Sequence, residues 1–267
     1  MAAEDSAFVV DIDRESGLTV LHGLSETYLN AKLDVLNLGC KGKFLTGGPQ
    51  VAYREGLGQS ADIDFSYKKQ DGQAGEFARV RIVFEPGVPN SGFVFRDQAG
   101  KGAIPRRFVP AIMAGVEAAK ENGLLAGFPV IDFSATLTDG AYHDLDSSRI
   151  AFEHAARRAF SQLREQGAPK LMEPIMRVEV VTPSDFIGAV IADFNSRRGH
   201  IVSCEGRGED HVVSANAPLS SLFGYEADLH QTSDSRATCI MVFDQYADVP
   251  SYIDPDPEFP PAIAMRV

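Results

Sequence analysis

Hydrophobic and polar positions alternate strictly in two stretches in the middle of the chain. In residues 77–84 every second side chain is apolar, and Arg79 and Arg81 occupy the opposite face. Residues 131–138 repeat the pattern, with Asp132 among the polar positions. A period of two indicates half-buried β-strands. Each stretch is therefore predicted to pack one face against a core.

Helical signals separate and follow these strands. One helix is predicted from Ile104-Pro105 to Asn122-Gly123, because proline favours the first turn of a helix and glycine its end. A second helix is predicted to open at Asp146-Ser147-Ser148, with Asp146 and Ser147 as caps, and to end at Gly167. Its apolar positions, among them Ile150, recur at helical spacing. Interspersed strands and helices give the class α+β.

The two ends of the chain have patterns of their own. Residues 8–46 are predicted to form a strand, a second strand, a helix and a third strand. These few elements would bury too little surface to be stable as an independent domain. Residues 171–250 predict the order β-α-β-β-α-β of ferredoxin-like domains, with Thr182 capping the first helix. The acidic, proline-rich residues 251–267 predict an extended tail. We therefore divide the chain into 1–48, 49–170, 171–250 and 251–267.

Composition excludes several classes of protein. Of the 267 residues 44% are hydrophobic and 23% charged, which is typical of a folded soluble chain. No apolar run approaches the ~20 residues that span a bilayer, and the acidic N-terminus is unlike a secretory signal. Three dispersed cysteines argue against a disulfide framework and a thiolate zinc site. We expect a cytoplasmic protein without membrane contact.

Charge is unevenly distributed along the chain. The formal net charge of −12 disfavours nucleic acid as a partner when it is taken alone. Residues 49–170, however, hold 15 basic and 15 acidic side chains, whereas residues 171–267 hold 6 and 15. The cations of the middle segment are clustered, for example at Lys68-Lys69 and Arg157-Arg158. The middle segment is therefore the better candidate for contact with RNA.

The polar loop at residues 139–148 allows three interpretations. Asp139, His143 and Asp146 supply ligand types for a small metal-dependent enzyme, although no distant motif completes the shell. A Ser-His-Asp hydrolase would lack the usual nucleophile elbow. In the third interpretation, His143 is exposed at the tip of a capped loop.

Two further segments suit phosphate contacts. The stretch 68–75 is predicted to be a loop whose lysines, amides and glycines allow close approach to a nucleic acid backbone. Arg197 and Arg198 fall at the predicted end of a helix, where cations also complement the helix dipole. Neither a phosphate-binding loop nor a dinucleotide-binding fingerprint is present in the sequence.

Taken together, six ordered strings resemble the C-terminal half of translation elongation factor G. They lie within residues 4–250, the part of the chain that the resemblance covers. The strings are 49–55 (PQVAYRE), 124–132 (LLAGFPVID), 139–148 (DGAYHDLDSS), 173–183 (EPIMRVEVVTP), 195–199 (NSRRG) and 218–225 (PLSSLFGY).

The resemblance implies the end of domain III, then domains IV and V, of a five-domain ribosomal GTPase. It implies a partial ferredoxin-like piece, a ribosomal-protein-S5-like βα domain and a C-terminal ferredoxin-like domain. Domain IV of such factors reaches the decoding centre and helps tRNA and mRNA move. Its ribosome-binding tip here would comprise Lys69, Gln70, Asp71, Gly72, Gln73, Gly140, Tyr142, His143 and Asp144, with secondary RNA contacts from Lys68, Arg197, Arg198 and Arg207.

The same resemblance implies partners and cofactors. The ribosome would be the partner, through ribosomal RNA and through tRNA and mRNA at the decoding centre, and the factor would be a monomer. GTP and magnesium would belong to a G domain that this sequence lacks, so that the chain would hold no cofactor, metal or catalytic residue of its own. We accordingly expect an excised part of a longer chain that packs against its own G domain; a free-standing ribosome-binding module is the alternative.

Some positions depart from the family pattern. At Gly23 to Leu29 the family usually has Gly-Met-Gly-Glu-Leu-His-Leu, and in the first tip loop Asp71 and Gln73 replace smaller or uncharged residues. An added carboxylate opposes phosphate binding. A paralogue that acts in ribosome recycling, or in tetracycline-resistance-type ribosomal protection, is therefore an alternative to a translocase.

Overall fold

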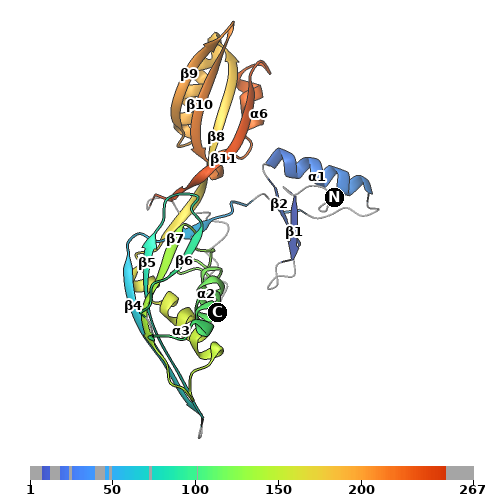
Figure 1. The fold of residues 1–267 in the computed structure, drawn as a ribbon. Helices are drawn as coiled ribbons and strands as arrows, with labels where there is room; N and C mark the ends of the chain where they lie inside the picture. Colours follow the sequence, from blue (N-terminus) through green and yellow to red (C-terminus); the bar gives the residue numbers. More distant parts are fainter. Residues whose placement is uncertain are drawn as a thin grey trace. The chain divides into compact units, whose positions relative to one another are not determined.

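The computed structural model describes residues 8–12, 19–23, 26–39, 46–47, 50–71, 74–100 and 102–250 (Figure 1). The chain divides into two compact units. Of the described residues, those from 53 to 173 and from 246 to 250 form one unit, which we call the central unit, and those up to 52 and from 174 to 245 form the other. Each is described by itself below. No helix in the described ranges is long and apolar enough to cross a membrane.

A four-stranded sheet forms the central unit. Its order is β4-β5-β7-β6, antiparallel except for the parallel pair β6 and β7. The strands predicted at 77–84 and 131–138 are confirmed within longer or shifted strands. The strands are β4 (Ala61–Asp71), β5 (Ala74–Pro86), β6 (Phe93–Asp97) and β7 (Phe133–Ala141), and short β3 (Arg54–Gly56) pairs with residues 170–172.

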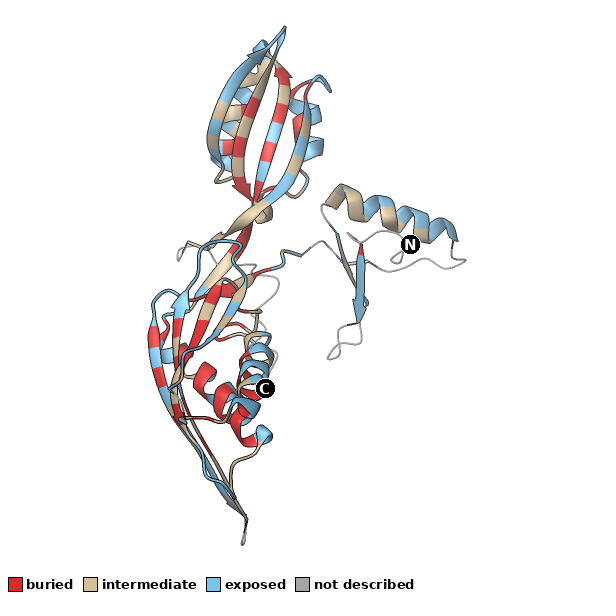
Figure 2. Ribbon diagram, in the orientation of Figure 1, coloured by how far each residue is buried: buried red, intermediate tan, exposed pale blue. Residues whose placement is uncertain are grey.

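Helices cover one face of this sheet (Figure 1). They are η1 (Arg106–Phe108), α2 (Val109–Lys120), α3 (Arg149–Ser161) and α4 (Leu163–Gln166). Burial alternates along the strands, so that the side chains facing the helices form one core (Figure 2). Phe84, Phe133 and Phe160 lie at its centre, each at most 1% exposed. Gly115 of α2 allows the two long helices to approach, because a Cβ there would lie 2.9 Å from that of Ala156.

Three local predictions in this unit are wrong, and one apolar position of the predicted helix lies outside the core. The stretch 68–75 is not a long loop, since β4 continues to Asp71 and β5 begins at Ala74. The cap of α3 is Ser148, whose Oγ accepts from the Ala151 N–H at 3.1 Å. Ile150 is 60% exposed, because it lies on the side of the first turn of α3 that faces away from the core. Residues 139–141 belong to β7, so the loop itself starts at Tyr142.

The N-terminal piece is small. β1 (Val9–Ile12) and β2 (Thr19–His22) pair antiparallel, and α1 (Glu26–Gly39) follows. These match the first three predicted elements. The strand predicted after the helix falls largely outside the described residues.

Residues 170–248 form the predicted βαββαβ order. The sheet order is β11-β8-β10-β9, the arrangement of ferredoxin-like domains. The predicted cap at Thr182 is wrong, because this residue is buried in β8 and the helical turn starts after Pro183. The elements are β8 (Lys170–Pro183), η2 (Ser184–Phe186), α5 (Ile187–Ser196), β9 (His200–Arg207), β10 (Asp210–Pro218), η3 (Leu219–Ser221), α6 (Tyr225–Thr232) and β11 (Thr238–Asp248).

Candidate functional site

The loop of residues 142–148 connects β7 to α3 and is fastened to the backbone of β5. The Phe77 N–H donates to the Asp146 carbonyl at 2.9 Å, and the Ser147 hydroxyl donates to the Phe77 carbonyl at 2.6 Å. The same hydroxyl accepts from the His143 N–H at 2.9 Å, and the Ser147 N–H donates to the His143 carbonyl at 3.0 Å. The loop is therefore held in one conformation by four hydrogen bonds.

His143 stands on the outside of this fixed loop. Its side chain is 57% exposed, and its Nδ1 lies 2.9 Å from Oδ2 of Asp146. Because Asp146 contacts Nδ1, it orients the imidazole and leaves Nε2 accessible to an external group. Gly75 permits the close approach of β5, because a Cβ there would lie 3.1 Å from the Asp146 carboxyl group.

The hairpin of β4 and β5 ends beside this loop. Residues 75 and 77 contact residues 146 and 147 close to where β4 ends at Asp71 and β5 begins at Ala74, so that both predicted tip segments meet at one end of the central unit. Lys68 and Lys69 are exposed on β4, opposite Phe77 and Glu76. Gly72 and Gln73 lie outside the described residues, and Gln70 and Asp71 are described only as backbone of β4.

The fixed loop also presents side chains of another kind. Leu145 is 89% exposed and Tyr142 is 38% exposed. Asp144, which lies between His143 and Leu145 in the sequence, is exposed as well. Our sequence analysis missed Leu145, although an apolar residue among polar neighbours in DGAYHDLDSS was a visible signal. Gly140, which we predicted at the tip, is instead buried in β7, where a Cβ would collide with Ile104.

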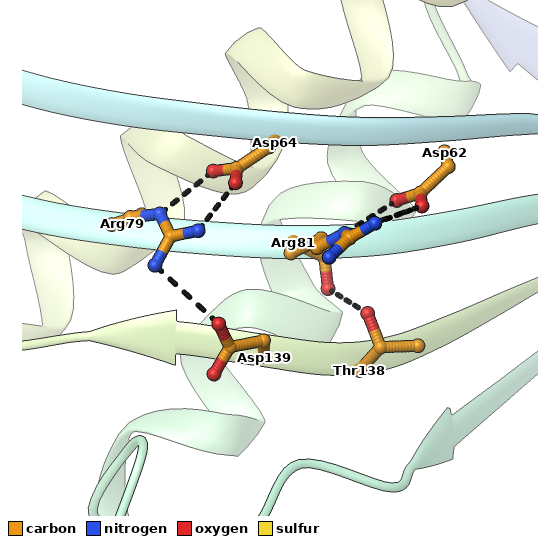
Figure 3. A network of polar contacts seen from close by, with 6 residues as sticks. All are labelled: Asp62, Asp64, Arg79, Arg81, Thr138 and Asp139. Carbon is orange, nitrogen blue, oxygen red and sulfur yellow. Dashed lines mark hydrogen bonds and ion pairs between the residues drawn. The ribbon is translucent and has the colours of Figure 1, made fainter.

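Arginines on the open face of the sheet pair with carboxylates from neighbouring strands (Figure 3). Arg79 donates to Asp64 through Nε at 2.8 Å and approaches Asp139 at 3.4 Å. Arg81 donates to Asp62 at 2.6 and 3.0 Å. A hydrogen bond from Arg79 lowers the pKa of the Asp64 carboxyl group. These arginines hold the strands in register and are occupied by carboxylates, which compete with any phosphate.

The structure does not assemble the metal site or the hydrolase considered above. Asp139 points to Arg79 on the sheet face, whereas His143 contacts Asp146 in the loop. Among the described residues no group of three or more metal-ligand side chains gathers. The Ser147 hydroxyl binds backbone groups and not the imidazole.

Comparison with known proteins now identifies the family. The family model "Elongation factor G, domain IV" matches residues 49–168, and "Elongation factor G C-terminus" matches residues 170–256. The chain belongs to the elongation factor G family. Elongation factor G of Hyphomonas neptunium is 51% identical over 250 residues, which are 94% of this chain and 35% of that protein. The Rhodopseudomonas palustris factor is 46% identical, over 95% of this chain and 37% of that protein.

A solved structure agrees with these matches. A crystal structure of a Thermus thermophilus protein superposes with a TM-score of 0.77 at 33% identity, over 94% of this chain and 37% of that one. The chain thus spans about a third of the length of these relatives. In the family's terms, the hairpin and the 142–148 loop belong to domain IV, and residues 170–256 to the C-terminal domain.

In the C-terminal domain, Arg197 has an internal role. Its Nε contacts Asp193 at 3.0 Å, one terminal nitrogen donates to Asp228 at 2.6 Å, and the other donates to the Ser221 carbonyl at 3.0 Å. The guanidinium lies 5.1 Å from the centre of the Tyr225 ring. Its nitrogens are thus used to join α5, η3 and α6, which does not fit the RNA contact predicted for Arg197. Arg207, by contrast, is exposed at the end of β9.

Domain IV contains one buried charged group that sequence analysis missed. Glu55 is completely buried, and its carboxylate accepts backbone N–H groups from five consecutive residues, 124–128. Gly123, immediately before these donors, has a φ of +67° and redirects the main chain toward the carboxylate. Both partners fall in strings that resemble the family, 49–55 and 124–132, but only the folded chain brings them together. This carboxylate is structural, because water cannot reach it.

Proposed function

We propose that this chain binds the ribosome and promotes movement of tRNA and mRNA through the tip of domain IV. The observation that carries the proposal is the locked 142–148 loop. It holds His143 exposed beside the hairpin end, with Asp146 behind the imidazole. A preorganised loop loses little conformational entropy when it meets its target. Exposed imidazole, phenol and lysine groups suit phosphate, ribose and base edges.

The partners follow from the same assignment. We propose contact with ribosomal RNA and with the tRNA–mRNA pair at the decoding centre, by a monomeric factor in the cytoplasm. Secondary contacts would come from Lys68, Arg198 and Arg207. The chain would act as a binding module without catalysis, while GTP and magnesium would be handled by a G domain, outside the two matched segments.

A chimera tests the role of the tip. Residues 49–250 of this chain replace the matching part of the Hyphomonas neptunium factor, to which the chain is 51% identical. His143→Ala is expected to slow translocation by about tenfold or more, because a contact worth about 1.4 kcal/mol in the transition state changes a rate tenfold. GTP hydrolysis on ribosomes is expected to stay within about twofold of the parent chimera.

The control is His200→Ala, which removes an exposed histidine of the C-terminal domain. Pre-steady-state translocation and phosphate release are measured in parallel for the three proteins. Equal translocation rates for the parent and His143→Ala would refute the role of the tip.

A further inference from the structure

A second polar feature of domain IV lies away from the tip, in the groove between α2 and α3. It has a volume of about 330 Å³ and is lined by the end of α2 and the last two turns of α3. His154, Arg157 and Arg158 contribute the charged or titratable groups, and Asn122 and Ser161 contribute neutral polar ones. Among the described residues, the lining contains no aspartate or glutamate.

The cations of this groove differ in their pairing. Arg157 donates to Glu153, one turn earlier on α3, at 2.6 Å. No carboxylate of the described residues lies within ion-pairing distance of Arg158. This contrasts with Arg79 and Arg81 on the opposite face of the sheet, each of which forms an ion pair with a carboxylate of β4. The groove therefore keeps uncompensated positive charge in a chain whose net charge is −12.

A row of side chains continues the groove toward the tip. The His154 ring stacks on Tyr67 of β4, with the ring centres 5.6 Å apart. Desolvation raises the pKa of Tyr67, as does its hydrogen bond to Glu76, and the charges of Lys69 and Arg158 oppose that rise. The stacked rings of His154 and Tyr67 join the groove to β4, and Glu76 lies beside them because it accepts a hydrogen bond from the Tyr67 hydroxyl at 3.1 Å. We call Arg158, His154, Tyr67 and Lys69 the flank of the groove.

We propose that this groove and flank bind the phosphodiester backbone of a structured RNA. The two arginines and the exposed imidazole of the groove are donors that suit phosphate oxygens. Arg158 forms no ion pair with a carboxylate of the described residues, whereas a phosphate would have to compete with Glu153 for Arg157 and with Glu76 for the Tyr67 hydroxyl. The inference rests on the proposed function, since it extends the RNA contact of domain IV from the tip loops to the α3 side. It assigns a backbone contact that positions RNA without reading its sequence.

The salt dependence of RNA binding tests this assignment. Binding of a fluorescein-labelled RNA duplex to the full 267-residue chain is followed by anisotropy at several KCl concentrations. The double variant Arg157→Gln/Arg158→Gln is expected to bind more weakly. Its slope of log affinity against log salt is expected to fall by about 1 for each phosphate that the variant no longer binds. The matched control is Arg96→Gln/Arg106→Gln, which removes two exposed arginines outside the groove and is expected to retain the parental slope.

Resonances of the His154 ring distinguish RNA from smaller anions. Shifts on adding the RNA duplex, but not GTP or inorganic phosphate at matched phosphate concentration, support the assignment. Shifts with GTP or phosphate alone would overturn it in favour of a small-anion pocket. An unchanged affinity and slope in Arg157→Gln/Arg158→Gln, with a parental circular dichroism spectrum, would also overturn it.

Ribosome pelleting separates this inference from the proposed function. If the parent chain pellets with ribosomes and the groove variant binds the RNA duplex normally, the proposed function of the tip stands and the RNA contact of the groove is rejected. A parent chain that does not pellet contradicts the proposed function, and the duplex measurement then decides the groove alone.

Discussion

A carboxylate that is removed from water needs donors around it, and Glu55 has five of them. Oε2 accepts from Leu124 and Leu125, and Oε1 accepts from Ala126, Gly127 and Phe128. Charge-assisted hydrogen bonds of this kind are about twice as strong as neutral ones. The donors are consecutive backbone groups, so the charge fixes the path of a whole loop. Glu55 is therefore expected to contribute to the stability of domain IV.

Replacing this charge by a neutral amide of the same shape tests that contribution. Glu55→Gln puts an NH₂ group where donors converge, and we expect a loss of about 3 kcal/mol or more in the free energy of unfolding. Urea unfolding of the 267-residue chain measures it. The control Glu85→Gln removes an exposed carboxylate of β5 and is expected to change little. Identical midpoints for Glu55→Gln and the parent would contradict the structural role.

At the scale of elements, alternation predicted β5 and β7 but was not followed into β4. Ile63, Phe65 and Tyr67 alternate with polar residues, so the signal was present, and the lysines and glycines of 68–75 outweighed it. In the hairpin these lysines extend the strand, because β5 supplies the pairing that the sequence alone cannot show. The donor ring around Glu55 was not predictable in this way, since it joins segments about 70 positions apart.

The ion pairs across β4, β5 and β7 make the stability of this sheet depend on pH. The folded pKa of Asp64 is lowered below its ordinary 3.8, so its contribution is complete above pH 3.8 and is lost as pH falls through the folded value. We expect Asp64→Asn to lower the melting temperature at neutral pH by less than about 3 °C, since both partners are partly exposed. The difference from the parent is expected to vanish at acidic pH.

Thermal unfolding over a pH series from neutral to below 3.8 measures this effect. Glu117→Gln, at an exposed position of α2, serves as the control. A difference between Asp64→Asn and the parent that grows as pH falls would contradict the ion pair as its cause.

At the scale of the whole molecule, the chain holds two separate hydrophobic cores. One uses residues between 57 and 163, and the other uses residues between 176 and 237, with no member in common among the residues that the structure describes. Phe84 lies in the first core and Phe194 in the second, and both are completely buried. Because neither side chain contributes to the other core, each unit is expected to keep its own unfolding transition.

Two cavity-forming substitutions test this independence. Phe84→Ala is expected to destabilise the domain IV core by about 3–5 kcal/mol, and Phe194→Ala to do the same for the C-terminal domain. In differential scanning calorimetry, each variant is then expected to show a lower melting temperature for one transition and an unchanged one for the other. The affected transition differs between the two variants. Both transitions moving together in either variant would contradict independent cores.

The attachment of the 142–148 loop has a consequence for how domain IV tolerates change. The loop binds position 77 through its N–H and carbonyl, which every residue but proline provides, whereas at position 75 it packs where a side chain would otherwise stand. In a saturation library selected for growth, position 77 would therefore accept many residues of suitable size and reject proline. Position 75 would favour glycine, because a Cβ there would lie 3.1 Å from the Asp146 carboxyl group, which would have to move. Selection would therefore act on main-chain hydrogen bonding at position 77 and on side-chain size at position 75.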